Sequence, residues 1–363
     1  MVRVLSGTMY TRISTNKKGR QIMLDASYFE GIRGAVYFPS RAYNAWQTWN
    51  ELNPEEIDRD FGYAEDAGLN ALRMFVSFEY WQEQPEKFFE RFEQVIALSQ
   101  KHGIRIMPVL FEDCGTDNTE ETRKNKDPHT AICVCSPCRA IQRDPARWVE
   151  VHGFVDAFMR RYGSDLRLLA IECMNEPHYE SGNVPFAQHI VHLAKGYHGA
   201  VPLTIGAICM PHNLYFGDDL DVYQYHDNFP QSAENLARVI KEAYHVQELT
   251  GKPCWLTEWQ RVREKGPGWD TAVIPKEYTA PALATLAPTV YGTGMGSFFW
   301  SLMVKPAYLM AQRPNGTYNG LFHEDGSVYS LEDYQAVAGK DKTRPVKASL
   351  PDWYAKRLEE QEA

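Results

Sequence analysis

The chain has 363 residues, of which 44% are hydrophobic and 23% charged, so it can bury a large core without disulfides or metal ions to hold it together. Its formal net charge is -9 and it has no long run of Lys or Arg, which argues against a nucleic-acid partner because phosphate binding needs a basic surface. No window approaches the ~18 consecutive apolar residues of a membrane span, so we expect no membrane partner either.

Residues 1–31 are expected to form an extension before the main fold, and the polar stretch 16–19 can turn a small hairpin. The stretch 1–7 has no sustained apolar segment of the signal-peptide type. We therefore expect the protein to be cytoplasmic, or secreted with a targeting segment that this sequence does not include. The seven cysteines are odd in number and several lie in apolar runs, which fits a reducing compartment.

A strand-like apolar run followed by a helical pattern recurs along the chain. Several of these runs are almost continuously hydrophobic, as expected of strands that are covered on both faces. Eight candidate strands result: 32–38, 70–77, 104–111, 168–174, 202–208, 221–225, 253–257 and 296–301.

Helix start and stop signals lie between most of the strands. Asn53, followed by Pro54 and two glutamates, is typical of a helix N-terminus, and Gly68 would end that helix. Similar signals predict further helices over 85–102, 145–163, 232–249, 281–291 and, in the C-terminal tail, 351–360.

Eight strands that alternate with helices predict the α/β class and a closed (β/α)8 TIM barrel, folded as a single domain with long βα loops. We expect the barrel to span 32–327 and residues 328–363 to wrap its outside. An open Rossmann-like sheet is the competing architecture. The stretch 37–41, after the first strand, lacks the Gly-rich phosphate turn of that fold.

Polar residues follow two of the apolar strands abruptly. The fourth strand ends in Asn175, Glu176 and a proline, and the seventh ends in Glu258. The active site of a barrel forms at the carboxyl ends of its strands, so both carboxylates should face the same mouth. Two carboxyl groups about 5 to 5.5 Å apart can act as proton donor and nucleophile at an anomeric carbon. The donor must keep its proton, so we expect the neighbouring Glu258 to raise the pKa of Glu176.

These motifs resemble those of the clan A glycoside hydrolases, and most closely family five, the cellulase-like and mannanase-like enzymes. The resemblance extends over residues 32–327 and includes the turn 320–326 after strand eight. It implies a retaining glycoside hydrolase that cleaves β-glycosidic bonds of oligo- or polysaccharides, with Glu176 as general acid/base and Glu258 as nucleophile. It implies no cofactor for catalysis.

The resemblance also implies roles for residues around the two carboxylates. Arg73 resembles the strand-two arginine that contacts the nucleophile, although an ion pair that only holds the barrel is the simpler interpretation. Trp300 resembles the strand-eight tryptophan that floors the subsite where the sugar is cleaved, and otherwise belongs to the core. Asn175 is a candidate to bond the sugar 2-hydroxyl.

The sequence departs from the family pattern after strands three and six. Glu112 and Asp113 stand where the family usually has a histidine, and they are candidates either to bind sugar hydroxyls or to hold the loop. After strand six His226 is kept, as a functional residue or as a satisfied histidine at a strand end. Asn228 stands where a tyrosine that bonds the nucleophile is expected, and Tyr225 is a candidate substitute.

Other aromatic residues that follow strands are candidates to line further sugar subsites. They are Trp46, Trp49, Tyr80, Trp81 and Trp259.

A cysteine cluster follows the third strand. Cys133, Cys135 and Cys138 lie within six positions, and Cys114 stands at the end of the strand. Four thiolates can close a tetrahedral structural zinc site, with His129 as an alternative ligand. The competing interpretation is reduced thiols or a local disulfide. Such a zinc ion would staple the loop and take no part in the chemistry.

The expected partner of a glycoside hydrolase is a carbohydrate. The sequence leaves three other functions open. A transglycosylase uses the same machinery with a sugar as acceptor. A carbohydrate-binding barrel would have lost turnover, which the presence of Glu176, Glu258 and Arg73 argues against. A metal-dependent barrel hydrolase would want histidine ligands after the first strand, where 37–39 has none. The sugar, the linkage, exo or endo action and the oligomeric state do not follow from the sequence.

Overall fold

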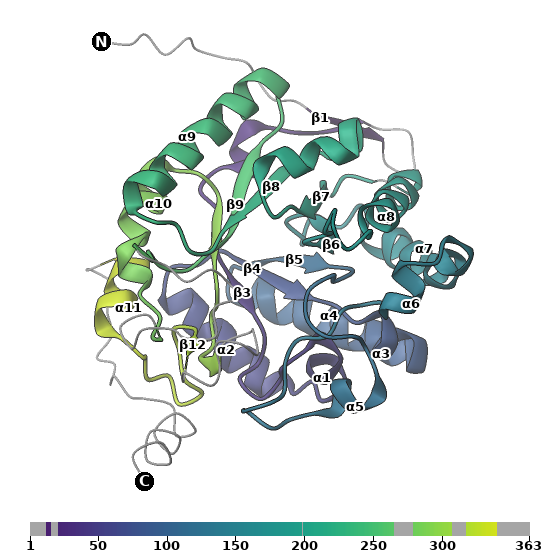
Figure 1. The fold of residues 1–363 in the computed structure, drawn as a ribbon, viewed down its shortest axis with the longest axis horizontal. Helices are drawn as coiled ribbons and strands as arrows, with labels where there is room; N and C mark the ends of the chain where they lie inside the picture. Colours follow the sequence, from purple (N-terminus) through teal and green to yellow (C-terminus); the bar gives the residue numbers. More distant parts are fainter. Residues whose placement is uncertain (1–11, 16–20, 198, 265–278, 307–316, 340–363) are drawn as a thin grey trace.

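The computed structural model describes residues 12–15, 21–197, 199–264, 279–306 and 317–339. Its centre is a sheet of eight strands surrounded by helices (Figure 1). The strands are β3 (Arg33–Tyr37), β4 (Ala71–Phe75), β5 (Arg105–Val109), β6 (Ile171–Asn175), β7 (Leu203–Gly206), β8 (Tyr223–Asp227), β9 (Cys254–Trp259) and β10 (Ser297–Phe299).

The eight strands form a nearly closed parallel barrel. Hydrogen-bonded neighbours run in the order β7-β6-β5-β4-β3-β10-β9-β8, so β3 and β10, the first and last barrel strands in the sequence, pair side by side. Between β7 and β8, the backbone N–H groups of Asp221 and Val222 donate to the carbonyl of Leu203 at 2.8 and 3.3 Å. These bonds bring the two remaining edges together and confirm the predicted (β/α)8 barrel.

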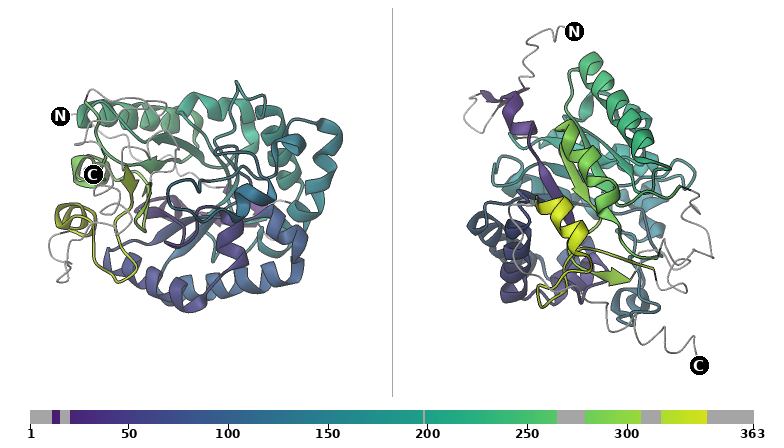
Figure 2. Two further views of the ribbon diagram at one scale, coloured as in Figure 1. Left: turned by 60° about the horizontal axis from the view of Figure 1, so that its bottom comes forward. Right: turned by 90° about the vertical axis from the view of Figure 1, so that its left-hand side faces the viewer.

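Helices lie outside the sheet, as the views in Figure 2 show. Their bounds are α1 (Ala45–Asn50), α2 (Pro54–Asp66), α3 (Phe78–Glu83), α4 (Pro85–Lys101), α5 (Glu120–Lys124), α6 (Arg139–Gln142), α7 (His152–Tyr162), α8 (Val184–Gly196), α9 (Ala233–Thr250), α10 (Ala287–Thr293) and α11 (Leu331–Ala338). Single 3₁₀ segments are η1 (Ala26–Phe29), η2 (Pro145–Val151), η3 (Met210–Asp219) and η5 (Leu283–Thr285).

Helix α2 illustrates why these segments fold as they do. The side chain of Asn53 accepts a hydrogen bond from the N–H of Glu55, and Pro54 occupies the first helical position. Gly68 then takes the positive φ of 69° that turns the chain towards β4. The predicted cap, first residue and stop signal all have the expected roles.

The N-terminal extension closes the end of the barrel at which the strands begin. Strands β1 (Arg12–Thr15) and β2 (Gln21–Leu24) pair as an antiparallel hairpin, as predicted, although its turn lies outside the described residues. The hydroxyl of Tyr28 donates to the carbonyls of Leu168 and Leu169, and Phe29 packs near Trp255 at the start of β9. The opposite, open end of the barrel is therefore the one that carries the strand carboxyl ends.

Some predicted boundaries are wrong. Strand β8 begins two residues later than predicted. The backbone N–H groups of residues 221 and 222 instead donate to Leu203 of β7, the contact that closes the barrel. The predicted helix 145–163 is divided into η2 and α7, and the predicted helix 281–291 into η5 and α10. The predicted C-terminal helix 351–360 lies outside the described residues; α11, which precedes it, packs beside η5 and α10.

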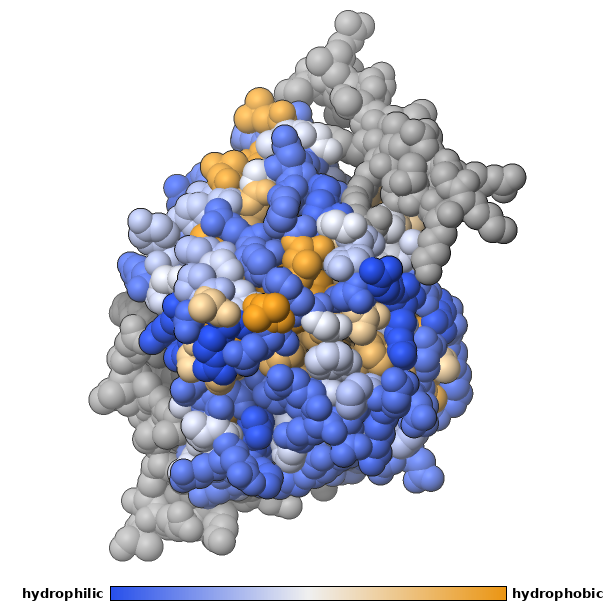
Figure 3. All heavy atoms as spheres, turned by 90° about the vertical axis from the view of Figure 1, so that its right-hand side faces the viewer, coloured by the Kyte–Doolittle hydropathy of each residue, from blue (hydrophilic) through white to orange (hydrophobic). Residues whose placement is uncertain are grey.

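The side of the molecule covered by α7 and α8 is mainly hydrophilic, with scattered hydrophobic residues (Figure 3). Within the described ranges, we find no helix with the length and apolar character needed to cross a membrane.

Candidate active site

The floor of the barrel mouth is a buried arginine that donates to three side chains. Arg73 on β4 is fully buried, and its Nε and Nη2 donate to the two carboxylate oxygens of Glu172 on β6 at 2.7 and 2.5 Å. Nη2 also donates to Asn175 Oδ1 at 2.5 Å, and Nη1 donates to Glu258 Oε1 at 2.7 Å. One guanidinium therefore links the ends of β4, β6 and β9, which a planar fork of five donors is suited to do.

Sequence analysis did not single out Glu172, which completes this floor. It lies within an apolar strand and has no exposed surface, so an unpaired charge there would be costly. The chain leaves room for it at Gly206 on β7, where an added Cβ would lie 2.3 Å from Glu172 Oε1 and 2.9 Å from Arg73 Nη2. A charged residue inside an apolar strand was the available signal, because such a residue needs a buried partner.

Glu258 ends β9 and is held on both carboxylate oxygens. Oε1 accepts from Arg73, and Oε2 accepts from Asn228 Nδ2 at 2.9 Å. The amide of Asn228 is oriented by Gln260, which donates to its Oδ1 at 2.9 Å. Asn228 stands where a tyrosine that bonds the nucleophile was expected, and its amide supplies a hydrogen bond to Glu258 in place of the tyrosine hydroxyl.

Glu176 follows β6 and faces the same mouth. Its backbone has a φ of 42°, which is uncommon for a residue other than glycine, and its N–H donates to the carbonyl of Gly206 at 2.7 Å. Oε1 accepts from His226 Nδ1 at 2.5 Å, and Oε2 accepts from the thiol of Cys114 at 2.9 Å. Its side chain keeps 20% of its surface exposed, against 7% for Glu258.

His226 stands between the two carboxylates. Its Nδ1 lies 3.7 Å from Glu258 Oε1 as well as 2.5 Å from Glu176. Carboxylate oxygens of Glu176 and Glu258 lie within 4.8 Å of one another and of the His226 ring nitrogen. The structure therefore brings Glu176, Glu258, His226, Arg73 and Asn175 together at the barrel mouth.

The direction of the Glu176 pKa corrects the expectation from sequence. Burial alone would raise it, but the hydrogen bond and charge of His226, with smaller contributions from Cys114 and Arg73, outweigh burial and lower the pKa to about 2. Burial lowers the pKa of His226, yet Glu258 and Glu176 outweigh it and the pKa is raised. Burial raises the pKa of Glu258 despite His226 and Arg73. These directions favour the protonated form of His226 and the ionised form of Glu176.

Two residues expected to contact substrate point away from the mouth. Tyr225 is buried, and its hydroxyl lies 3.2 Å from Met295 Sδ. Trp259 has no exposed surface and packs on Tyr291 and Phe299. Tyr225 precedes His226 and Trp259 follows Glu258, and both His226 and Glu258 face the inside of the barrel. Because successive side chains of a strand alternate between its faces, Tyr225 and Trp259 lie in the layer between sheet and helices.

Most of the aromatic residues expected to line sugar subsites lie in the helix layer, and Trp300 is the exception. Trp49 and Tyr80 are buried in the helix layer, and the indole of Trp46 donates to Glu83 at 3.0 Å. Trp81 packs on Phe78 and Phe154 in the same layer. Trp300 does lie at the mouth, where it shares an apolar cluster with Phe38, Phe75 and residues of β3 and β5.

The exposed aromatic residues beside Glu176 were not anticipated. Tyr179, three residues after Glu176, is 69% exposed and stacks on Tyr215 of η3, with ring centroids 6.1 Å apart. Tyr215 also lies against His212, at 5.2 Å. Their positions depend on loops whose conformation the local sequence does not fix.

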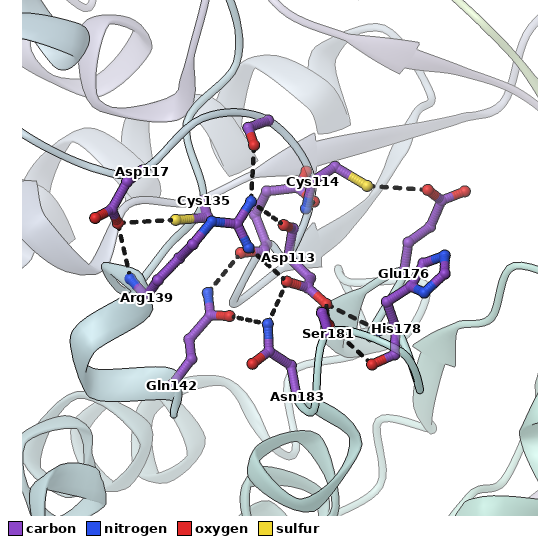
Figure 4. A network of polar contacts seen from close by, with 12 residues as sticks. Asp113, Cys114, Asp117, Cys135, Arg139, Gln142, Glu176, His178, Ser181 and Asn183 are labelled. Atoms are coloured by element: carbon purple, nitrogen blue, oxygen red, sulfur yellow. Dashed lines mark hydrogen bonds and ion pairs between the residues drawn. The ribbon is translucent and has the colours of Figure 1, made fainter. Parts of the chain in front are cut away.

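Glu112 and Asp113 hold loops, which is one of the two roles that the sequence left open for them. Glu112 is buried, and its Oε1 accepts from Asn175 Nδ2 at 2.9 Å and from the N–H of Cys114 at 2.7 Å. Asp113 accepts from the N–H of His178 at 2.8 Å and from Ser181 at 2.9 Å, and it also bonds Asn183 and Arg139 (Figure 4). Glu112 thereby orients Asn175, and Asp113 ties the loop after β5 to the loop after β6.

The four cysteines proposed as zinc ligands do not converge. Within the described ranges, the one group of His, Cys, Asp and Glu side chains with atoms close enough to share an ion is Glu176, His226 and Glu258. Cys114 contacts Glu176, Cys133 lies 3.9 Å from the carbonyl of Cys114, and Cys135 lies 3.6 Å from Asp117. None of the seven cysteines forms a disulfide, and Cys138 precedes α6 as its cap residue. The loop is closed by hydrogen bonds, and among the described residues Cys114, Cys133, Cys135 and Cys138 do not lie close enough together to share an ion.

The barrel, with an arginine floor and carboxylates after β6 and β9, has the fold of the clan A glycoside hydrolases that its motifs resemble. Three solved structures illustrate the likeness. The exo-β-1,4-mannosidase Op5Man5 from Opitutaceae bacterium strain TAV5 is 14% identical with a TM-score of 0.57, over 90% of this chain and 60% of that chain. The present chain thus spans less than two thirds of that protein.

The other two structures are matched over most of their length. GH5_18 from Streptomyces cattleya, solved in complex with GlcNAc, is 14% identical with a TM-score of 0.56, over 89% of this chain and 83% of that chain. The endo-β-1,4-mannanase from Thermotoga petrophila is 15% identical with a TM-score of 0.53, over 88% and 79%. At these identities the likeness establishes the fold.

Sequence comparison adds little. No family model matches the chain. A segment of 54 residues, 15% of this chain, is 39% identical to 75% of the large ribosomal subunit protein bL31 from Thermus thermophilus. So short a segment does not account for an eight-stranded barrel, and no functional argument is built on it.

Proposed function

We propose that the protein is a retaining β-glycosidase that cleaves β-linked glycosides by double displacement. The observation that carries the proposal is the pair Glu176 and Glu258, with carboxylate oxygens within 4.8 Å of one another at the ends of β6 and β9. A retaining mechanism needs two carboxyl groups about 5 to 5.5 Å apart, whereas an inverting one needs about 6.5 to 9.5 Å to admit water between them.

The hydrogen bonds of the two residues support different roles for them. Glu258 is held on both oxygens by Arg73 and Asn228, so its carboxylate is fixed in position to act as the nucleophile. Its carboxylate would attack the anomeric carbon while Glu176 delivers a proton to the departing glycosidic oxygen. Water would then attack the same carbon, giving its proton back to Glu176 and releasing Glu258.

The proton for the first step would come from the Glu176–His226 pair. In the free site the protonated form of His226 is favoured, and its Nδ1 lies 2.5 Å from Glu176 Oε1. In the reactive form of the pair the titratable proton would sit on Glu176 Oε2, facing the glycosidic oxygen, while neutral His226 still donates from Nδ1 to Oε1; transfer of the Oε2 proton to the leaving oxygen would then leave Glu176 ionised. The acid therefore titrates as a pair, and its apparent pKa belongs to neither residue alone.

The solved structures guide the choice of sugar. Two of them are described as a mannosidase and a mannanase that act on β-1,4 linkages. We therefore propose β-mannosides as the first substrates to test, with glucosides, galactosides, xylosides and fucosides beside them.

The test is turnover of this panel of aryl β-glycosides by the wild type, Glu258→Ala and Glu90→Ala, a matched change at an exposed position of α4. Turnover should vanish in Glu258→Ala alone. NMR of the first product should show the β anomer.

Azide then separates the two roles. In Glu258→Ala, azide should restore turnover by attacking the anomeric carbon from the side where the Glu258 carboxylate would lie, which gives an α-glycosyl azide. In Glu176→Ala it should intercept the glycosyl-enzyme and give the β-azide. An inverted first product, or equal turnover in Glu258→Ala and Glu90→Ala, would contradict the proposal.

A further inference from the structure

The thiol of Cys114 lies against the residue proposed as acid/base. Cys114 follows β5, and its Sγ is 2.9 Å from Glu176 Oε2, as the close view in Figure 4 shows. The other oxygen of Glu176 is bonded by His226. Both carboxylate oxygens of Glu176 are therefore occupied by side-chain donors, one of them a strong donor and the other a weak one.

The chain fixes the position of Cys114 from several sides. Its N–H donates to Glu112 Oε1 at 2.7 Å, and Glu112 exchanges backbone hydrogen bonds with Ser136 at 2.7 and 2.8 Å. The next residue, Gly115, has a φ of 88°, and a Cβ there would lie 2.3 Å from the carbonyl of Cys133. The loop can make this turn because position 115 is glycine, so the thiol is placed by a defined backbone.

Asp113 joins the loop that carries Cys114 to the loop that carries Glu176. It accepts from the N–H of His178 and the hydroxyl of Ser181, both shortly after Glu176, and from the amide of Asn183 at the start of α8 (Figure 4). The thiol and the carboxylate are thus held on two loops that are tied together one residue from the thiol.

We propose that Cys114 is a positioning residue for Glu176, an inference that rests on the proposed function of this site. Its thiol donates to Oε2 in the free enzyme and holds the carboxylate in the orientation for proton transfer. The glycosidic oxygen of the substrate then replaces the thiol on the same oxygen. A weak donor suits this task, because the substrate has little hydrogen-bond energy to displace.

The ionisation of the thiol agrees with a donor role. Burial, the charges of Glu176 and Glu112 and the hydrogen bond to Glu176 raise the pKa of Cys114 well above its ordinary value. The sulfur thus keeps its proton at neutral pH and can donate it.

The first test of the contact needs no catalytic activity. Because the Glu176 charge holds the thiol protonated, Glu176→Gln should raise the thiolate fraction of Cys114 and speed its alkylation by iodoacetamide at pH 8, by about tenfold for each pH unit that the thiol pKa falls. Mass spectrometry of the Cys114 peptide measures the rate. Cys138, in the same loop but bonded to no carboxylate in the described structure, is the internal control.

The second test measures the consequence for acid catalysis. Cys114→Ala removes the donor and Cys114→Ser keeps one, while Cys138→Ser is the matched control at a helix cap. For Cys114→Ala, kcat on a glycoside with a poor, alkyl leaving group should fall about tenfold, whereas a dinitrophenyl glycoside, which leaves without protonation, should react as in the wild type. Losing a donor raises a carboxyl pKa, so the alkaline limb of kcat/KM should move up by up to about one pH unit. Cys114→Ser should restore both values.

The outcomes separate this inference from the proposed function. Equal alkylation of Cys114 in the wild type and Glu176→Gln would overturn the contact whether or not the protein cleaves glycosides. Normal kcat on both leaving groups in Cys114→Ala would overturn the positioning role while leaving the glycosidase proposal intact. A wild type that cleaves no glycoside, with alkylation that depends on Glu176, would overturn the glycosidase proposal, and with it the role in proton transfer, while keeping the contact.

Discussion

The floor and the rim of the barrel mouth hold their carboxylates in different ways. On the floor, Glu172 and Glu258 are paired with the buried guanidinium of Arg73 on strand ends. On the rim, Glu176 is bonded by a histidine and a thiol that come from β8 and from a loop. The floor carboxylates are the more buried, and the rim carboxylate keeps access to solvent.

This contrast suits two chemical tasks. A nucleophile must stay ionised and fixed, which a rigid ion pair on strands achieves. A proton donor must exchange its proton with substrate and water, which calls for partial exposure and for partners that can give way. The predictions below test whether the floor is in fact the stiffer and energetically more important of the two.

The largest effect is expected for Arg73→Met. The change leaves Glu172 and Glu258 buried without a counter-charge, which should lower the free energy of unfolding by about 3–5 kcal/mol. Urea denaturation at neutral pH measures it, with Cys114→Ala on the rim as the comparison. A loss no greater than that of Cys114→Ala would refute the contrast between floor and rim.

A smaller loss is expected for Gly206→Ala, which changes the floor without removing a charge. The new Cβ would meet Glu172 Oε1 at 2.3 Å and Arg73 Nη2 at 2.9 Å, and such overpacking costs about 1–3 kcal/mol. Activity should fall as well, since the guanidinium must shift. The control is Gly292→Ala in α10, where no neighbour lies within 4 Å and alanine should be neutral or stabilising. Thermal unfolding compares the two variants, and equal melting temperatures would show that the floor yields easily.

An effect of opposite sign is expected at Glu79 of α3, which accepts a hydrogen bond from Ser136 of the rim loop at 2.9 Å. Burial raises its pKa to about 7, above the value of an unfolded chain, so the folded state keeps a proton that the unfolded state loses. Stability therefore declines as the pH rises from about 4.5 to 7. Glu79→Gln should remove this decline and stabilise the protein by about 2 kcal/mol at pH 8 and by much less at pH 5. Urea denaturation at both pH values measures it, with Glu90→Gln as control, and a gain independent of pH would contradict the titration.

The sequence predicted the barrel because its strands are covered on both faces and read as apolar runs with helix signals between them. Glu176, Glu258 and Arg73 could be found because each ends or interrupts such a run. Tyr225 and Trp259 each precede or follow an inward-facing residue of their strand, so the alternation of strand side chains directs both to the outer face.

Loop contacts could not be predicted in the same way. The thiol of Cys114 reaches Glu176 only because Asp113 bonds residues 65 to 70 positions away. No local spacing records such a contact, and the nearby cysteines left a metal site and reduced thiols both open. The pKa of Glu176 was misjudged for a related reason, since it depends on the distance of His226 from another strand.

The backbone at Glu176 has an energetic consequence. A φ of 42° costs an L-residue about 1 kcal/mol or more that glycine would not incur. Glycine at this position would avoid that cost, but it would also remove the carboxylate from the barrel mouth. The chain therefore keeps a carboxylate here at the expense of backbone energy.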